Sequence, residues 1–297
     1  MKIRIAKNSG FCFGVKRAIK MAEDASKKYN EIVTLGSIIH NPQMVKKLEQ
    51  QGIHKVNSLS EIKGRPTIIR SHGVEKNTFN KLLEQNIEIV DTTCPYVSKT
   101  QEYTQLLGKA GYQVIILGDK NHPEVIALQS YSDGNTIVVK DASELPDKKF
   151  DKVGVISQTT RNIEDLQNLT RELLPRCREL RIMNTICNAT SIRQKATLEL
   201  AKESDLMIVI GGRNSSNTKM LAKISGKYIK THHIEVAEEI DKKWFKNVEN
   251  IGITAGASTP DWIIVEVYNK IIEYLGNHEK KISKIEDIPG LRSKDER

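Results

Sequence analysis

Short runs of apolar, often β-branched residues alternate along the chain with longer stretches whose apolar residues recur at helical spacing. A glycine or a cluster of polar residues follows most of the short runs, as is typical of strands that lead through a turn into a helix. Strands that alternate with helices favour parallel sheets covered by helices. The pattern therefore predicts an α/β protein.

The pattern repeats three times. In a first set, each segment reads as a buried strand, a glycine turn, a polar loop and a helix, at residues 32–42, 114–124 and 207–217. A second set reads as a strand, a polar tip and a helix, at residues 67–73, 153–160 and 251–258. In the first two repeats a third strand follows, one at residues 87–90 and one beginning at Arg181, and leads to Cys94 or Cys187.

The third repeat has no such strand after its last helix, at residues 260–275, but the N-terminal run from Ile3 to Ala6 leads towards Cys12 and can supply it. We therefore predict three pseudo-symmetric α/β units that present loops to a common centre. Their predicted bounds are residues 13–94, residues 95–187, and residues 188–275 together with 1–12. Residues 276–297 are charged and predict a poorly ordered or peripheral C-terminal tail.

The three cysteines occur in one repeated context. A single cysteine at a strand end is usually a small buried hydrophobic residue, but the repetition favours a shared three-cysteine site. Structural zinc usually takes four ligands, often from closely spaced cysteines, and the chain has no CxxC motif. Three soft sulfur ligands suit an iron–sulfur cluster, and a four-iron cluster held this way keeps one iron open to substrate. The fourth cysteine, Cys177, lies outside the repeated strand ends and is predicted to be incidental.

The loops of the repeats carry polar side chains that can bind an anion. The first loops contain His40, His122 and the run Ser215, Ser216 and Asn217, and the second loops contain His72, Thr159 and Ser258. Donors beside helix N-termini form phosphate sites, because the terminal N–H groups lack partners and the helix dipole favours negative charge. The alternatives are ordinary helix caps for the serines and the asparagine, and structurally hydrogen-bonded histidines.

Glu124 begins a predicted helix in the second repeat. It can complement the helix dipole there, or it can act as a general acid that delivers a proton to a leaving group.

Charge and composition limit the kinds of binding partner that we expect for this chain. The net charge is +9, which fits phosphates or an acidic redox protein but also a lysine-rich solvated surface. Aromatic residues make up 5% of the chain and no nucleic-acid motif is visible, so we expect no nucleic-acid partner. No apolar run approaches the roughly 20 residues that span a bilayer, and four cysteines in 297 residues do not form a disulfide framework. We expect a cytoplasmic protein that is not bound to a membrane.

Seven motifs, in this order and over about residues 1–275, together resemble the 4-hydroxy-3-methylbut-2-enyl diphosphate reductase family, which catalyses the last step of non-mevalonate isoprenoid biosynthesis. The motifs are Gly10-Phe11-Cys12-Phe13-Gly14-Val15, Ser71-His72-Gly73-Val74, Asp91-Thr92-Thr93-Cys94-Pro95, His122-Pro123-Glu124-Val125, Ser157-Gln158-Thr159-Thr160, Thr185-Ile186-Cys187-Asn188-Ala189-Thr190 and Ser215-Ser216-Asn217.

The resemblance implies an iron–sulfur oxidoreductase. It would convert (E)-4-hydroxy-3-methylbut-2-enyl diphosphate to isopentenyl diphosphate and dimethylallyl diphosphate with two electrons and two protons. The metal ligands implied for a [4Fe–4S] cluster with one open iron are Cys12, Cys94 and Cys187. The residues implied for the diphosphate are His40, His72, Ser215, Ser216, Asn217 and Ser258, with His122 nearby. Glu124 would be the proton source, Thr159 would position the substrate hydroxyl and relay the proton, and reduced ferredoxin or flavodoxin would supply electrons.

Two other classes of protein remain open from the residues alone. An iron–sulfur sensor that binds a phosphorylated metabolite explains the cysteines and the loops but gives Glu124 and Thr159 no task. A zinc hydrolase that uses the same cysteines is disfavoured because no two of them are closely spaced.

Overall fold

The computed structural model of the chain describes residues 1–132, 134–276 and 282–287. The chain forms two compact units. Unit 1 contains residues 1–13, 40–42 and the chain from Asn188 onward, and unit 2 contains residues 14–39 and 43–187.

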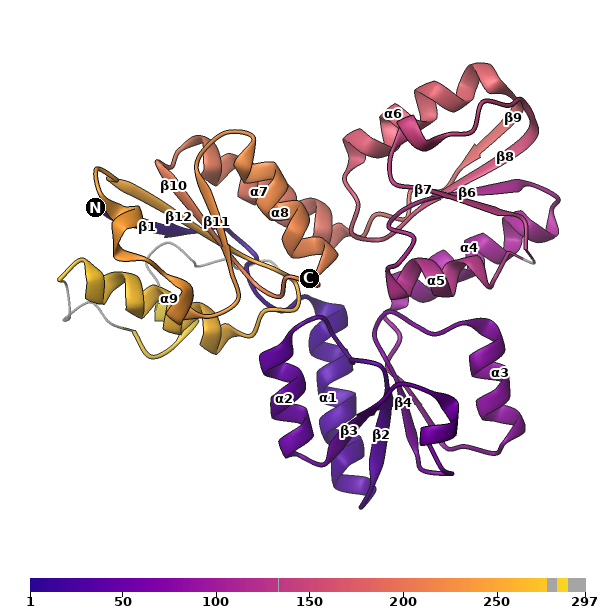
Figure 1. Cartoon of the computed structure of the whole chain (residues 1–297), viewed down its shortest axis with the longest axis horizontal. Coiled ribbons are helices and arrows are strands. Elements are labelled where there is room, and N and C mark those ends of the chain that lie inside the picture. Colours follow the sequence, from indigo (N-terminus) through magenta and orange to yellow (C-terminus); the bar gives the residue numbers. More distant parts are fainter. Residues whose placement is uncertain (133, 277–281, 288–297) are drawn as a thin grey trace. The chain divides into compact units, whose positions relative to one another are not determined.

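Unit 1 is built on one parallel sheet with the strand order β1-β12-β10-β11 (Figure 1). The strands are β1 (Lys2–Ile5), β10 (Leu206–Ile210), β11 (Thr231–Ile234) and β12 (Asn250–Ala255). Every residue of β10 is buried, as expected for a central strand covered on both faces.

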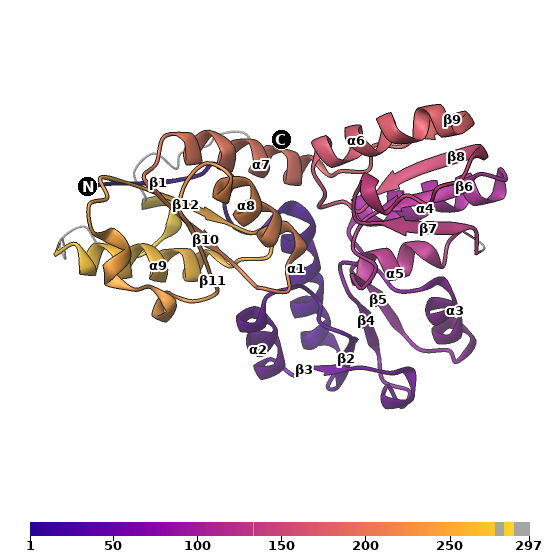
Figure 2. The same cartoon turned by 45° about the horizontal axis from the view of Figure 1, so that its top comes forward.

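Three helices cover the sheet of unit 1. They are α7 (Asn188–Lys202), α8 (Ser216–Gly226) and α9 (Asp261–Tyr274). The apolar side of α9, including Ile264 and Ile271, packs with Ile208 and Ile253 on one face. Leu200 of α7 packs with Met207 on the other, where α8 also lies (Figure 1, Figure 2).

Unit 2 contains two further parallel sheets. The first has the order β3-β2-β4-β5 and consists of β2 (Ile32–Leu35), β3 (Ile53–Val56), β4 (Thr67–Ile69) and β5 (Ile89–Asp91). Helix α3 (Lys76–Glu84) inserts Leu82 against one face. Helices α1 (Phe13–Lys28) and α2 (Pro42–Gln50) lie on the other (Figure 1), and Figure 2 shows β5 beside β4 at the edge.

The second sheet of unit 2 has the order β7-β6-β8-β9. Its strands are β6 (Gln113–Leu117), β7 (Thr136–Val139), β8 (Phe150–Ser157) and β9 (Cys177–Ile182). Helix α6 (Ile163–Leu173) packs Leu166 and Leu169 on one face. Helices α4 (Pro95–Lys109) and α5 (Pro123–Gln129) place Leu107 and Leu128 on the other.

The three sheets share one plan, which confirms the predicted fold class of three parallel α/β units. In each sheet, the strand of the second repeated set pairs with an edge strand: β4 with β5, β8 with β9 and β12 with β1. The N-terminal strand β1 pairs in parallel with β12, from Lys2 opposite Asn250 to Ile5 opposite Ile253. The prediction that the N-terminus completes the third sheet is therefore confirmed, whereas the predicted domain boundaries at residues 94 and 187 stay predictions.

One expectation about local structure needs correction. The strand before Cys187 ends at Ile182, earlier than its apolar run predicts. Past the end of this backbone pairing, the side chain of Thr185 hydrogen-bonds the adjacent strand β8 instead. The Thr185 hydroxyl accepts from the Ser157 N–H at 2.9 Å and donates to the Ser157 carbonyl at 2.5 Å.

Residues 282–287, the described part of the predicted tail, pack on unit 1, and the expectation of a poorly ordered or peripheral extension stays a prediction. Ile285 is buried in the core beneath α9, and the Asn269 side chain bonds the backbone N–H and carbonyl of Ile282 at 2.9 and 2.8 Å. Residues 277–281 and 288–297 lie outside the described residues.

Within the described ranges, no helix combines the length and the apolar character that crossing a bilayer requires. The expected cytoplasmic location stays a prediction.

Candidate active site

Each of the three predicted cysteine ligands stands directly before a helix. Cys12 precedes α1, Cys94 precedes α4 and Cys187 precedes α7. The unpaired N–H groups of a helix N-terminus and the helix dipole favour a negatively charged sulfur at this place. The local structure thus suits three thiolate ligands.

The backbone of each cysteine is fixed by the loop that follows the neighbouring strand. The cysteine N–H donates to a loop carbonyl in all three cases: Cys12 to Ala257 at 3.1 Å, Cys94 to Ser71 at 3.0 Å and Cys187 to Thr159 at 3.0 Å. The three loops are the ones that carry the predicted residues Ser258, His72 and Thr159. The repeat in the sequence is therefore a repeat in the geometry, and each cysteine is held beside a predicted binding loop.

A threonine two residues before the cysteine ties two of these segments to the adjacent strand. The Thr92 hydroxyl donates to the Ile69 carbonyl at 2.5 Å, and the Thr185 hydroxyl donates to the Ser157 carbonyl at the same distance. The repeated threonine therefore has a structural explanation.

Cys177 differs from the other three. It begins β9, donates its thiol to the Leu173 carbonyl at 3.3 Å, and packs against the core beneath α6. Burial raises the pKa of the Cys177 thiol. None of the four cysteines forms a disulfide within the described residues.

Glu124 is the most unusual charged group of unit 2, because its side chain is 1% exposed. It lies in the first turn of α5, where its carboxyl group receives two hydrogen bonds from one residue. The Thr159 N–H donates to Oε1 at 2.7 Å and the Thr159 hydroxyl donates to Oε2 at 2.9 Å. Burial raises the pKa of Glu124 from its ordinary value of 4.5 to about 7, although both bonds from Thr159 oppose the shift. A carboxyl group with this pKa can carry a proton at neutral pH and release it.

His122 and His72 lie near this pair. His122 is the N-cap of α5, and its Nδ1 accepts from the Glu124 N–H at 3.2 Å. The rings of His72 and His122 meet edge to face, with centroids 5.5 Å apart. Unit 2 therefore gathers Glu124, Thr159 and two imidazoles close to the loops that hold Cys94 and Cys187.

In unit 1, the predicted serine and asparagine residues lie at the N-terminus of α8. Ser215 is its N-cap and accepts from the Thr218 N–H at 3.3 Å, so its capping role is real. Asn217 is 3% exposed, and neither atom of its side-chain amide has a hydrogen-bond partner within the described part of the chain. Because a buried amide without partners is costly, Asn217 is explained best by a ligand that supplies them.

Glycines lie in close contact with the residues around the start of α8. A Cβ on Gly212 would lie 2.7 Å from the His40 carbonyl oxygen, and one on Gly256 would lie 2.1 Å from the Thr218 hydroxyl. Gly211 adopts a φ of 143°, which disfavours any residue with a side chain. The Ser258 hydroxyl donates to the His40 carbonyl at 3.0 Å. Unit 1 thus brings His40, Ser258 and the start of α8 together, and the glycines allow this close approach.

The predicted site residues divide between the units. Unit 1 holds Cys12, His40, Ser215, Ser216, Asn217 and Ser258, and unit 2 holds His72, Cys94, His122, Glu124, Thr159 and Cys187. Sequence reasoning missed Gln158, which lies inside one of the quoted motifs and is fully buried. It also missed Thr218, whose buried hydroxyl lacks a hydrogen-bond partner within the described residues; its position one residue after Asn217 was the available signal.

The geometry defines a class of protein: a three-sheet α/β protein in which equivalent loops hold cysteines before helices. Its unit 2 contains a buried carboxyl group, and its unit 1 contains a helix start with a buried amide that lacks a partner within the described residues. The sequence profile described as LytB protein matches residues 3–272, and the chain accordingly belongs to the LytB protein family.

Relatives along the whole chain agree with this assignment. The 4-hydroxy-3-methylbut-2-enyl diphosphate reductase of Geobacter sulfurreducens is 48% identical over 278 residues, which are 92% of this chain and 98% of the relative. The enzyme of the same name from Trichlorobacter lovleyi is 46% identical, over 94% of this chain and all of the relative.

Two solved structures are also similar. One is described as (E)-4-hydroxy-3-methyl-but-2-enyl diphosphate reductase, the terminal enzyme of the non-mevalonate pathway. It is 44% identical, with a TM-score of 0.68 over 91% of this chain and 99% of that one. The other is the E-1-hydroxy-2-methyl-but-2-enyl-4-diphosphate reductase from Plasmodium falciparum, 29% identical, with a TM-score of 0.85 over 93% of this chain and 89% of that one.

Proposed function

We propose that this protein is a 4-hydroxy-3-methylbut-2-enyl diphosphate reductase. The reaction consumes the allylic alcohol, two electrons and two protons, and yields water with isopentenyl diphosphate or dimethylallyl diphosphate. The C–O bond at C4 breaks, a proton goes to the departing oxygen, and the second proton and the electron pair end in a new C–H bond.

The observation that carries the proposal is the Glu124–Thr159 pair. A buried carboxyl group with a pKa of about 7 is a suitable proton donor, and the Thr159 hydroxyl at 2.9 Å can pass a proton to a bound alcohol. Thr159 also accepts from the N–H of Cys187. A sensor or a storage protein would need no such proton path.

We propose that Cys12, Cys94 and Cys187 hold a [4Fe–4S] cluster. Their chemistry fits: each precedes a helix, none forms a disulfide within the described residues, and three sulfurs leave one position without a protein ligand. When bound, the cluster supplies the electrons and a Lewis-acidic iron. The protein's own part is to bind the substrate, orient it and deliver protons.

The diphosphate is proposed to bind through the loops that carry the histidines and the start of α8. Asn217, whose buried amide lacks a partner within the described residues, would hydrogen-bond a phosphate oxygen, and the N–H groups and dipole of the helix start would favour its negative charge. Ser215, Ser216, Ser258, His40, His72 and His122 are proposed to complete the set. Fixing the diphosphate in this way would hold the reacting carbon in one orientation.

The electron donor is proposed to be reduced ferredoxin or flavodoxin. Both are acidic proteins, and the net charge of +9 on this chain would attract them.

The test is turnover by protein purified without oxygen. With a reduced viologen dye as electron source, the protein should consume the allylic diphosphate alcohol and release both isoprenoid diphosphates. Protein that contains the cluster but leaves the alcohol unchanged would overturn the proposed function.

A further inference from the structure

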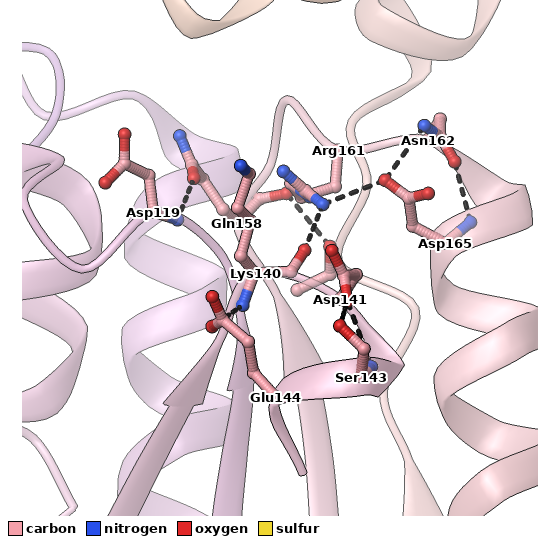
Figure 3. Close-up of polar contacts among 10 residues, drawn as sticks. Asp119, Lys140, Asp141, Ser143, Glu144, Gln158, Arg161, Asn162 and Asp165 are labelled. Carbon is pink, nitrogen blue, oxygen red and sulfur yellow. Dashed lines mark hydrogen bonds and ion pairs between the residues drawn. The ribbon is translucent and has the colours of Figure 1, made fainter.

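Gln158 lies buried between two loops of unit 2, and both atoms of its amide are used. Its Oε1 accepts from the Asp119 N–H at 3.1 Å, and its Nε2 donates to the Thr160 hydroxyl at 3.1 Å. Figure 3 shows the bond to Asp119. Asp119 lies in the loop that leads to α5 and Glu124, and Thr160 follows Thr159. The Gln158 side chain therefore joins the loop that precedes Glu124 to the turn in which Thr159 hydrogen-bonds the Glu124 carboxyl group.

The backbone is shaped to admit this amide. A Cβ on Gly118 would lie 3.2 Å from Oε1 of Gln158 and 2.6 Å from Val125. Only a residue without a side chain allows the two loops to approach so closely.

The turn that contains Thr159 is anchored at both ends. At its start, the Gln158 N–H donates to the Leu117 carbonyl at 2.8 Å, and the Arg161 N–H closes the turn on the Gln158 carbonyl at 3.0 Å. At its end, the Arg161 guanidinium pairs with Asp165 at 2.8 Å and donates to the Lys140 carbonyl (Figure 3). This ion pair is largely buried, because the two side chains are 10% and 18% exposed.

The backbone N–H, the hydroxyl and the carbonyl of Thr159 are all hydrogen-bonded. Its N–H and hydroxyl point to the Glu124 carboxyl group, and its carbonyl accepts from Cys187. A small rotation of the turn would weaken the bonds on both sides of Thr159 at once.

We infer that Gln158 is a positioning residue: by joining Asp119 to Thr160, it aims the Thr159 N–H and hydroxyl at Glu124. The inference rests on the proposed function for its consequence in catalysis. It assigns to Gln158 the control of how strongly Thr159 stabilises the ionised form of Glu124.

The test is Gln158→Met, which keeps the length of the side chain and removes both hydrogen bonds. Weaker bonds from Thr159 leave the Glu124 carboxylate less stabilised, so its pKa should rise. The pH at which turnover falls should move upward, kcat should fall about tenfold, and KM should stay within about twofold, since mispositioning near the reacting atoms costs rate more than binding.

A second readout does not depend on turnover. An infrared difference titration of the purified protein follows the carboxyl band of Glu124, assigned by its absence from Glu124→Gln. In Gln158→Met this band should titrate at higher pH than in the unchanged protein.

Gln113→Met is the matched control. Gln113 starts β6, the strand that leads to Asp119, and its side chain makes one bond, to the Asn135 carbonyl at 3.1 Å. This variant should leave the carboxyl titration and the pH profile unchanged. An unchanged Glu124 titration in a folded Gln158→Met protein overturns the inference and leaves the proposed function intact. Absence of turnover in the unchanged protein overturns the proposed function, while the infrared titration still tests the positioning.

Discussion

Glu124 occupies a place where an ionised carboxylate is unfavourable. It is removed from solvent and receives two hydrogen bonds, both from Thr159, while burial shifts its pKa to about 7. Between pH 4.5 and 7, Glu124 is protonated in the folded state but ionised in the unfolded state. The free energy of unfolding therefore falls as the pH rises through this window. From the two pKa values, the cost at high pH is on the order of 3 kcal/mol. The fold tolerates this cost, in our account, because the site needs a proton donor.

Glu124→Gln separates the two effects. The amide keeps the shape and an acceptor for the Thr159 N–H but carries no proton to donate, so turnover should fall by about 100-fold or more. The free energy of unfolding at pH 8 should rise, while at pH 4 it should change little. Denaturant unfolding at the two pH values measures the second effect. A variant that turns over normally, or one whose stability gain is the same at both pH values, contradicts the account.

Asn217 is expected to lower the stability of the fold while increasing the affinity for the diphosphate. Since its buried amide lacks partners within the described residues, Asn217→Ala should leave the melting temperature unchanged or raise it, because an unsatisfied polar group is removed. KM for the diphosphate should rise about tenfold, as expected for the loss of a charge-assisted bond.

Ser215→Ala is the comparison, because Ser215 caps α8. This variant should lose about 1 kcal/mol of stability as well as affinity. Loss of stability in Asn217→Ala with no change in KM would show that the asparagine is structural.

At the scale of elements, one junction occurs three times: a cysteine at the start of a helix, with its N–H bonded to the loop of the adjacent strand. Cys94, for example, is the N-cap of α4, with Pro95 at the first helical position, and proline suits this position because the N–H it lacks would have no partner there. The junction places a sulfur at the positive end of the helix without requiring the sulfur for the fold.

Cys94→Ser tests this independence. Serine is a good N-cap, so the melting temperature of the iron-free protein should be unchanged or slightly higher. Iron content after anaerobic purification should fall, and the absorption of the cluster should disappear. A full iron content in this variant contradicts the ligand assignment, and an unfolded variant contradicts the structural independence.

The sequence could predict the elements and the junctions because both repeat. The strand at Ile3–Ala6 was assigned to the third sheet only because two complete repeats showed what was missing. The end of β9 could not be predicted, since a threonine side chain replaces backbone pairing there. The proposed role of Gln158 could not be predicted either, because it depends on a bond to the backbone N–H of Asp119, 39 residues away in the chain. The burial of Ile285 could not be predicted, because three isoleucines and one leucine among the charged residues of 276–297 give a weak apolar signal.

At the scale of the molecule, the chain forms unit 2 from one nearly continuous stretch and unit 1 from both ends. The cores under α3, α5 and α6 are made of residues between Val33 and Ile186. The core of unit 1 instead needs Ile5 from β1 together with β10, β12 and α9. Unit 2 therefore has what a domain needs to fold alone, and unit 1 does not until both ends of the chain are present.

A fragment of residues 14–187 should therefore fold cooperatively, as circular dichroism during thermal unfolding would show. A fragment that starts at Asn188 should aggregate, because the edge of β12 and the contacts of Ile5 are left exposed. Joining residues 1–13 by a flexible linker after the C-terminus should restore folding to that second fragment. An unfolded 14–187 fragment would contradict this division.

The central claim is the proposal that Cys12, Cys94 and Cys187 hold one cluster with an iron that lacks a protein ligand. The Mössbauer spectrum of ⁵⁷Fe-enriched protein, purified without oxygen, tests it most directly. The account predicts four cluster irons per chain, one of them distinct from the other three and altered by addition of the diphosphate alcohol. A spectrum without cluster iron, or with four equivalent irons that the alcohol does not affect, would contradict it.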